Sequence, residues 1–85
     1  MREFAYTITD PVGIHARPAG LLVKELSRFS CATTISRGED SCDGKKLLSL
    51  MKLRVKQGET IVAKADGPDE DAAIEAAKTF LSANL

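Results

Sequence analysis

The hydrophobic positions of this chain change their spacing after the first ten residues. Over Arg2–Thr9 apolar and polar residues alternate, and this period of two is typical of a half-buried strand. Pro11 and Gly13 interrupt the pattern, because proline cannot donate to a strand ladder and glycine permits a sharp backbone turn. Over Ala16–Arg28 the apolar residues follow a helical spacing instead. The apolar residues on the strand face are Phe4, Tyr6 and Ile8.

The remainder of the chain predicts three further strands and two further helices. We expect strands over Cys31–Arg37, Asp40–Asp43 and Glu59–Asp66, and helices over Lys45–Leu53 and from Asp69 onward. This order, with short turns between strands, favours a mainly antiparallel sheet with its helices on one face, an α+β fold. We expect one domain over residues 1–85.

The two later helices carry finer expectations. Lys45–Leu53 has apolar residues on more than one face, so some should stay exposed and form a docking patch. Packing of most of them into the core is an equally open alternative. In the last helix Asp69 is a good N-cap, and the acidic residues after it suit the positive helix end. The predicted buried stripe of that helix is Ala73, Ile74, Ala77, Phe80 and Leu81.

Charge and composition exclude several classes of function. Twelve basic residues balance twelve acidic ones, which argues against a nucleic-acid partner, because such a partner requires a clear basic excess. No apolar run approaches the roughly 20 residues of a membrane span, and the first residues lack the apolar segment of a signal peptide, so we expect a cytoplasmic protein without membrane insertion.

Cys31 and Cys42 lack the paired spacing of a zinc site. We expect free thiols, with a structural disulfide as the less favoured alternative, and no metal or cofactor.

The only histidine, His15, stands where the strand pattern gives way to the helix pattern. The first amides of a helix have no partner within it, and the helix dipole adds positive charge, so a helix start binds anions. Ala16 and Arg17 would offer such amides, while Pro18 suits the first turn because it lacks one. Arg17 also carries a planar charged group that matches phosphate oxygens. Gly13 would let the loop turn so that the imidazole lies over the helix end.

A histidine in this position can also react with the anion. The positive field of the helix start favours the neutral imidazole, whose lone pair can attack phosphorus. One ring, one arginine and a few amides suit a phosphoryl group that must be passed on. The chain has no P-loop and no carboxylate cluster for magnesium, so we do not expect it to bind a nucleotide donor. From the spacing alone, an ordinary helix cap or surface histidine remains the commoner interpretation.

The seven residues Gly13-Ile14-His15-Ala16-Arg17-Pro18-Ala19 resemble the active-site signature of the HPr family, the histidine-containing phosphocarriers of the bacterial sugar phosphotransferase system. The resemblance covers the whole chain, including the turn at Gln57 and the helix entry at Gly67. It implies an open-faced sandwich of four antiparallel strands under three helices (βαββαβα). It also implies a carrier rather than an enzyme. Phospho-Enzyme I would donate a phosphoryl group, taken from phosphoenolpyruvate, to Nδ1 of His15, and the group would pass to IIA domains of sugar permeases with help from Arg17.

The sequence departs from the family pattern at several positions. Lys46 stands where the family has its regulatory serine, and a lysine cannot accept that phosphate. Ser49 is a possible substitute, although an ordinary solvent-facing serine is the favoured interpretation. Val12 offers no side-chain hydrogen bond to a phosphate, and Arg54 replaces a frequent glycine. By position, the implied docking residues of this monomeric carrier are Ala16, Gly20, Lys24, Lys46, Leu47, Leu48, Met51 and Lys52.

Two other functions compete with the sugar phosphocarrier. The first is an HPr-like regulatory or nitrogen-related protein that acts by docking to partners, and only the identity of those partners would separate it from a carrier. The second is a small nucleic-acid or ligand-binding α+β domain. The second is disfavoured because the chain has neither a basic excess nor an aromatic platform on which bases could stack.

Overall fold

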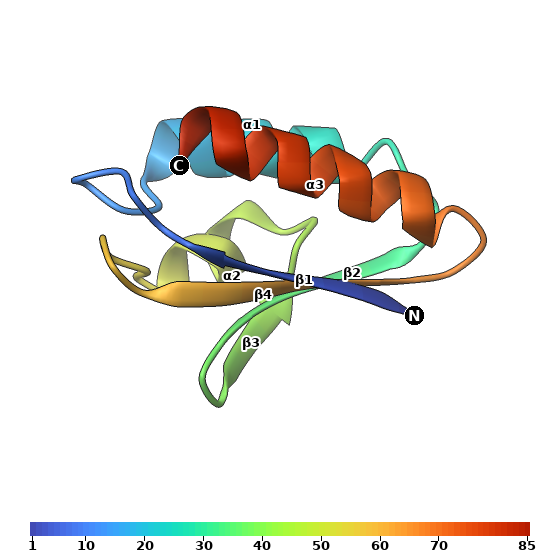
Figure 1. The fold of residues 1–85 in the computed structure, drawn as a ribbon, viewed down its shortest axis with the longest axis horizontal. Helices are drawn as coiled ribbons and strands as arrows, with labels where there is room; N and C mark the ends of the chain where they lie inside the picture. The colour runs from blue at the N-terminus through green and yellow to red at the C-terminus, as the bar shows by residue number, and fades with distance from the viewer.

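Four strands form one sheet, and three helices cover one of its faces (Figure 1). The computed structural model describes all residues from Met1 to Leu85. The strands lie in the order β1-β4-β2-β3, and every neighbouring pair is antiparallel. The predicted βαββαβα order and the open-faced sandwich are therefore confirmed. The elements are β1 (Arg2–Thr7), α1 (Ala16–Leu26), β2 (Ala32–Arg37), β3 (Asp40–Asp43), α2 (Leu47–Lys52), β4 (Thr60–Asp66) and α3 (Glu70–Asn84).

Alternation along the central strands places one set of side chains under the helices. In β4, Ile61, Ala63 and Ala65 are buried, whereas the residues between them are at least partly exposed. Phe4 and Tyr6 of β1 pair with Ala63 and Ile61 and extend the same face. Burial of each large aliphatic side chain contributes about 1.5–3 kcal/mol, so aliphatic contacts dominate the free energy of folding. The large residues with almost no exposure are Ile8, Leu22, Leu26, Ile35, Leu50, Ile61 and Leu81.

Several elements are shorter than the sequence pattern predicts. β1 ends at Thr7 rather than at Thr9, because the backbone N–H groups of Thr9 and Asp10 donate to the carbonyl oxygen of Leu85 instead of to a strand. Figure 1 shows the end of α3 beside the loop that follows β1. α1 stops at Leu26 rather than at Arg28, since the amides of Arg28 and Phe29 bond three residues back and tighten the last turn. β2 and β4 begin one residue later than predicted, and α2 is confined to Leu47–Lys52.

The start of α3 corrects one prediction about a side chain. Asp69 occupies the N-cap position, but its carboxylate caps no amide of α3. It accepts the backbone N–H groups of Ser30 at 2.8 Å and Cys31 at 2.9 Å. These bonds, that from Ser30 above all, hold the pKa of the Asp69 carboxyl below its usual range. The side chain therefore joins α3 to the beginning of β2 rather than stabilising its own helix.

Three further side chains bear on the sequence predictions. Phe80, which we placed in the buried stripe of α3, is only half-buried. Cys31 is buried, Cys42 is half-buried, and both are free thiols. Burial raises the pKa of both thiols, which keeps them in the protonated, unreactive form.

The backbone at Arg54 provides a test of local strain. Arg54 is the only non-glycine residue with a positive φ, at 51°, and it follows the end of α2. Its carbonyl oxygen accepts a bond from Arg37, which a glycine would retain. Because a side chain in this conformation costs roughly 1 kcal/mol, Arg54→Gly should raise the free energy of unfolding by about 0.5–1 kcal/mol in urea denaturation. Lys52→Gly, in the last turn of α2, is the control and should lower it by about as much. Equal destabilisation by both changes would contradict this account.

Candidate functional site

His15 is the residue from which α1 begins. Its backbone is extended (φ −115°, ψ 179°), and its carbonyl oxygen accepts the N–H of Ala19 at 3.0 Å as the first bond of the helix. The side chain caps no amide, and 41% of it is exposed. The backbone of His15 therefore accepts the first hydrogen bond of the helix, while the imidazole stays free for other contacts.

The loop before His15 is held by backbone contacts with the segment that follows α2. Ile14 donates its N–H to the carbonyl oxygen of Val55 at 3.0 Å, and its side chain is buried. Gly13 has a φ of 78°, and a Cβ there would collide with the Val55 carbonyl oxygen and lie 2.8 Å from Cα of Lys56. The Gly13 N–H donates to the Asp10 carbonyl oxygen at 2.9 Å and closes the turn. Both its φ and the lack of space require glycine at this position.

The start of α1 presents uncompensated positive charge beside the imidazole. The amides of Ala16 and Arg17 donate to no acceptor in the chain, and the first turn contains no acidic residue. Pro18 is buried in that first turn. The Arg17 side chain is exposed and takes part in none of the hydrogen bonds or ion pairs of the structure. The helix dipole and this guanidinium together make the surface next to His15 attractive to an anion.

The site includes an acidic residue that the sequence pattern did not reveal. Oδ2 of Asp10 lies 3.9 Å from Nε2 of His15, and Oδ1 accepts the N–H of Val12 at 2.8 Å. The sequence showed Asp10 only as part of a turn, and no periodicity relates it to a residue five positions later. Because of this bond the Val12 amide, like its side chain, has no hydrogen bond left to offer a phosphate.

A shallow depression of about 160 Å³ surrounds the imidazole and the guanidinium. α3 contributes to it through Asn84, a residue that sequence reasoning missed because it is far away along the chain. The residue after it, Leu85, accepts bonds from the backbone of Thr9 and Asp10 through its carbonyl oxygen. The lining residues are Asp10, His15, Arg17, Pro18, Leu21 and Asn84.

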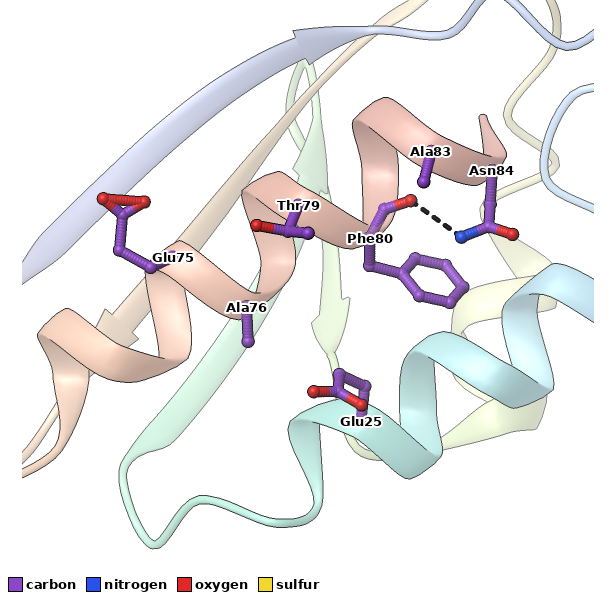
Figure 2. A pocket seen from close by; sticks show the side chains of 7 residues that line it. All are labelled: Glu25, Glu75, Ala76, Thr79, Phe80, Ala83 and Asn84. Atoms are coloured by element: carbon purple, nitrogen blue, oxygen red, sulfur yellow. Dashed lines mark hydrogen bonds between the residues drawn. The ribbon is translucent and has the colours of Figure 1, made fainter.

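A larger groove of about 480 Å³ lies between α1 and α3. Figure 2 shows the Phe80 ring projecting from α3 toward α1, with Glu25 opposite on α1. The Asn84 side chain donates to the Phe80 carbonyl oxygen at 3.0 Å, so Asn84 borders both hollows. This groove contains no histidine, cysteine or arginine, whereas His15 and Arg17 both line the smaller depression.

The predicted docking residues lie on neighbouring surfaces of α1 and α2, which contact each other. Leu48 is 75% exposed, and Leu47 and Met51 are also exposed, which confirms that α2 leaves apolar surface uncovered. Ala16, Lys24, Lys46 and Lys52 are exposed as well, and Gly20 is half-buried. Whether a partner binds there stays a prediction.

Of the two positions tied to serine regulation, one immediately precedes α2 and the other lies within it. Lys46 is the N-cap residue of α2, and its side chain caps no amide. Ser49 is half-buried and borders a depression between α2 and β3, together with Cys42. Ser49 therefore lies toward the sheet rather than on the apolar patch around Leu48.

Two glycines allow a matched test of the loop. Gly13→Ala should lower the free energy of unfolding by about 2 kcal/mol or more, because the backbone would be strained and the new methyl group would displace the segment at Val55. Gly20→Ala in α1 meets no atom within 4 Å and should raise it by up to about 1 kcal/mol. Thermal and urea unfolding of both variants measure the contrast. Equal effects of the two substitutions would show that the close backbone approach is unimportant.

Comparison with known proteins assigns the chain to a family. Residues 2–83 match the family model described as the PTS HPr component phosphorylation site. The phosphocarrier protein HPr of Mycoplasma capricolum is 45% identical over 78 residues, which cover 92% of this chain and 88% of that protein. A crystal structure of HPr from Thermoanaerobacter tengcongensis superposes with a TM-score of 0.93 at 32% identity, covering 98% of this chain and 93% of the other.

A third likeness is to Crh, the catabolite repression protein of Bacillus subtilis, whose crystal structure is described as a domain-swapped dimer. It gives a TM-score of 0.79 at 28% identity, covering 94% of this chain and 92% of the other. No helix of the present structure is long and apolar enough to cross a membrane. Because the match to the family model spans nearly the whole of this chain, the chain belongs to the HPr family of phosphocarrier proteins of the phosphotransferase system.

Proposed function

We propose that this chain accepts a phosphoryl group from phospho-Enzyme I on His15 and passes it to IIA domains of sugar permeases. The observation that carries the proposal is a free, partly exposed imidazole at the start of α1, beside two unpaired amides and the Arg17 guanidinium. The family match, to a model of a phosphorylation site, supports the same assignment. The protein acts as a carrier in the cytoplasm, as a monomer.

The geometry suits a group that must be held and then released. The imidazole supplies the nucleophile, with Nδ1 assigned by resemblance to the family. The amides of Ala16 and Arg17, together with the Arg17 side chain, stabilise negative charge on the phosphoryl oxygens. Two amides and one exposed guanidinium bind the phosphoryl group only moderately tightly, which favours its onward transfer. Gly13 and Pro18 shape the backbone that positions these groups.

The partners dock on the surface around α2. Its apolar centre is formed by Leu47, Leu48 and Met51, and the lysines around it are Lys24, Lys46 and Lys52. An apolar centre within a basic rim suits a partner whose own rim is acidic. Such charge complementarity accelerates encounter while leaving release fast.

Lys46 removes the serine through which many relatives would be regulated, so we propose that this chain is not controlled by a serine kinase at that position. Ser49 is a poor substitute because it is half-buried and borders the depression next to β3.

The likeness to Crh keeps a regulatory protein that acts by docking as the second candidate function. The identity of the partners distinguishes the two, because His15 and Arg17 are present in either case.

Incubation with phosphoenolpyruvate and Enzyme I should add one acid-labile, base-stable phosphoryl group to His15, as read by mass spectrometry of the intact protein and its peptides. His15→Ala should abolish the modification without unfolding the protein. Arg17→Ala should remain phosphorylatable but react about 10- to 100-fold more slowly, because one charged donor is lost. Arg28→Ala, just beyond the far end of α1, is the matched control and should react at the normal rate. An unmodified wild-type protein, or a modified His15→Ala variant, would refute the carrier function.

The basic rim should make association with Enzyme I sensitive to salt. Lys46→Ser should lower the association rate about 2- to 5-fold at low ionic strength, and the difference should shrink as salt screens the charges. Lys78→Ser on α3, away from the patch, is the control and should leave the rate unchanged. Stopped-flow or surface plasmon resonance measurements give both rate constants. A wild-type association rate that does not depend on salt would contradict charge steering.

A further inference from the structure

We propose that Asp10 is a positioning residue for His15: it keeps the ring proton on Nε2, leaves Nδ1 as the nucleophile, and balances the charge of the phosphorylated ring. This inference rests on the proposed function of His15 and adds to it a residue outside the seven-residue signature. The observation behind it is the distance of 3.9 Å between Oδ2 of Asp10 and Nε2 of His15.

The carboxylate of Asp10 is held in place by the backbone around it. Its Oδ1 accepts the N–H of Val12 at 2.8 Å, and its carbonyl oxygen accepts the N–H of Gly13 at 2.9 Å. The N–H of Asp10 itself donates to the carbonyl oxygen of Leu85 at 2.9 Å. These three bonds leave one carboxylate oxygen, Oδ2, without a hydrogen-bond donor. The only cationic or potentially cationic group near that oxygen is the imidazole.

The charges that face the ring come from two elements. The loop supplies Asp10, α1 supplies Arg17, and the only lining residue from α3 is the uncharged Asn84. Asp10 and Arg17 form no ion pair with each other. The carboxylate is therefore free to act on Nε2, and the guanidinium is free to act on the phosphoryl oxygens.

This arrangement selects one tautomer of the neutral ring. A separation of 3.9 Å exceeds hydrogen-bond range, but a carboxylate there still favours N–H over a lone pair on the nitrogen that faces it. With the proton on Nε2, the lone pair is on Nδ1. The same carboxylate becomes a counter-ion once the ring is charged, and the attraction grows because both groups then carry full charges.

The transfer step balances without any proton transfer. The Nδ1 lone pair attacks the phosphorus of the donor's phosphoryl group, the Nδ1–P bond forms, and the bond between that phosphorus and the donor breaks with its electron pair returning to the donor. The His15 ring keeps its Nε2 proton and becomes a cationic N-phosphoryl imidazolium opposite Asp10. In the onward step the Nδ1–P bond breaks, its pair returns to Nδ1, and the neutral Nε2–H ring is restored.

The first test uses the unphosphorylated protein. In wild type, long-range ¹⁵N–¹H spectra at alkaline pH should show the proton of the neutral ring mainly on Nε2. Asp10→Asn removes the charge but keeps an oxygen for the Val12 amide, and it should shift the population toward the Nδ1–H form. Asp10→Ala removes both the charge and the oxygen that accepts the Val12 amide. A wild-type tautomer ratio in Asp10→Asn would overturn the inference. So would a shift seen only in Asp10→Ala, because the turn rather than the charge would then be responsible.

The second test uses the phosphorylated protein and hydrolysis of its phosphohistidine across a range of pH. A cationic ring is the better leaving group, so the pH above which hydrolysis slows should be lower in Asp10→Asn than in wild type, by roughly half a unit. Asp40→Asn, on β3, is the charge-matched control and should give the wild-type profile. Identical profiles for Asp10→Asn and wild type would overturn the inference. Failure of the wild type to become phosphorylated would refute the proposed function instead, and the tautomer measurement would still decide the role of Asp10.

Discussion

The position of the candidate site depends on a contact between two segments of backbone. Gly13 turns with a positive φ against the carbonyl group of Val55, and Ile14 donates its N–H to the same oxygen. Because no side chain separates the two segments, the loop has no room to shift toward α2. Ile14 is buried beneath the loop, so the next residue, His15, emerges at the surface where α1 begins. The free imidazole is thus a consequence of how the loop is packed.

The sequence predicts features that arise from local periodicity. The alternation in β4 identifies the buried side chains, and the break at Pro11 and Gly13 identifies the turn before α1. Both can be derived without knowledge of the rest of the fold, because side-chain direction in a strand and backbone freedom at glycine are local properties. The order of elements and the location of His15 follow from them.

Features that depend on distant segments could not be derived in this way. Asp69 has every property of an N-cap residue, yet its carboxylate bonds to Ser30 and Cys31, which are close only in the folded chain. The strand pattern continues to Thr9, but Leu85 takes the amide bonds that would extend β1. The approach of Asp10 to His15 likewise requires the exact path of the turn. In the first two cases a polar group that local rules assign to one partner meets a competing partner from a distant part of the chain.

The predicted docking surface and the loop before His15 are linked by a short piece of chain. α2 has only six residues, and Leu50 is the only one of them that is buried, so its other apolar side chains necessarily point outward. After α2 the buried Leu53 anchors the chain again, Arg54 reverses its direction with a positive φ, and Val55 meets Gly13. Only two residues separate the end of α2 from the contact that positions His15. A partner bound to α2 would therefore lie at a defined distance from the imidazole, as direct transfer of a group between two proteins requires, because reacting atoms must meet at about 3–3.5 Å.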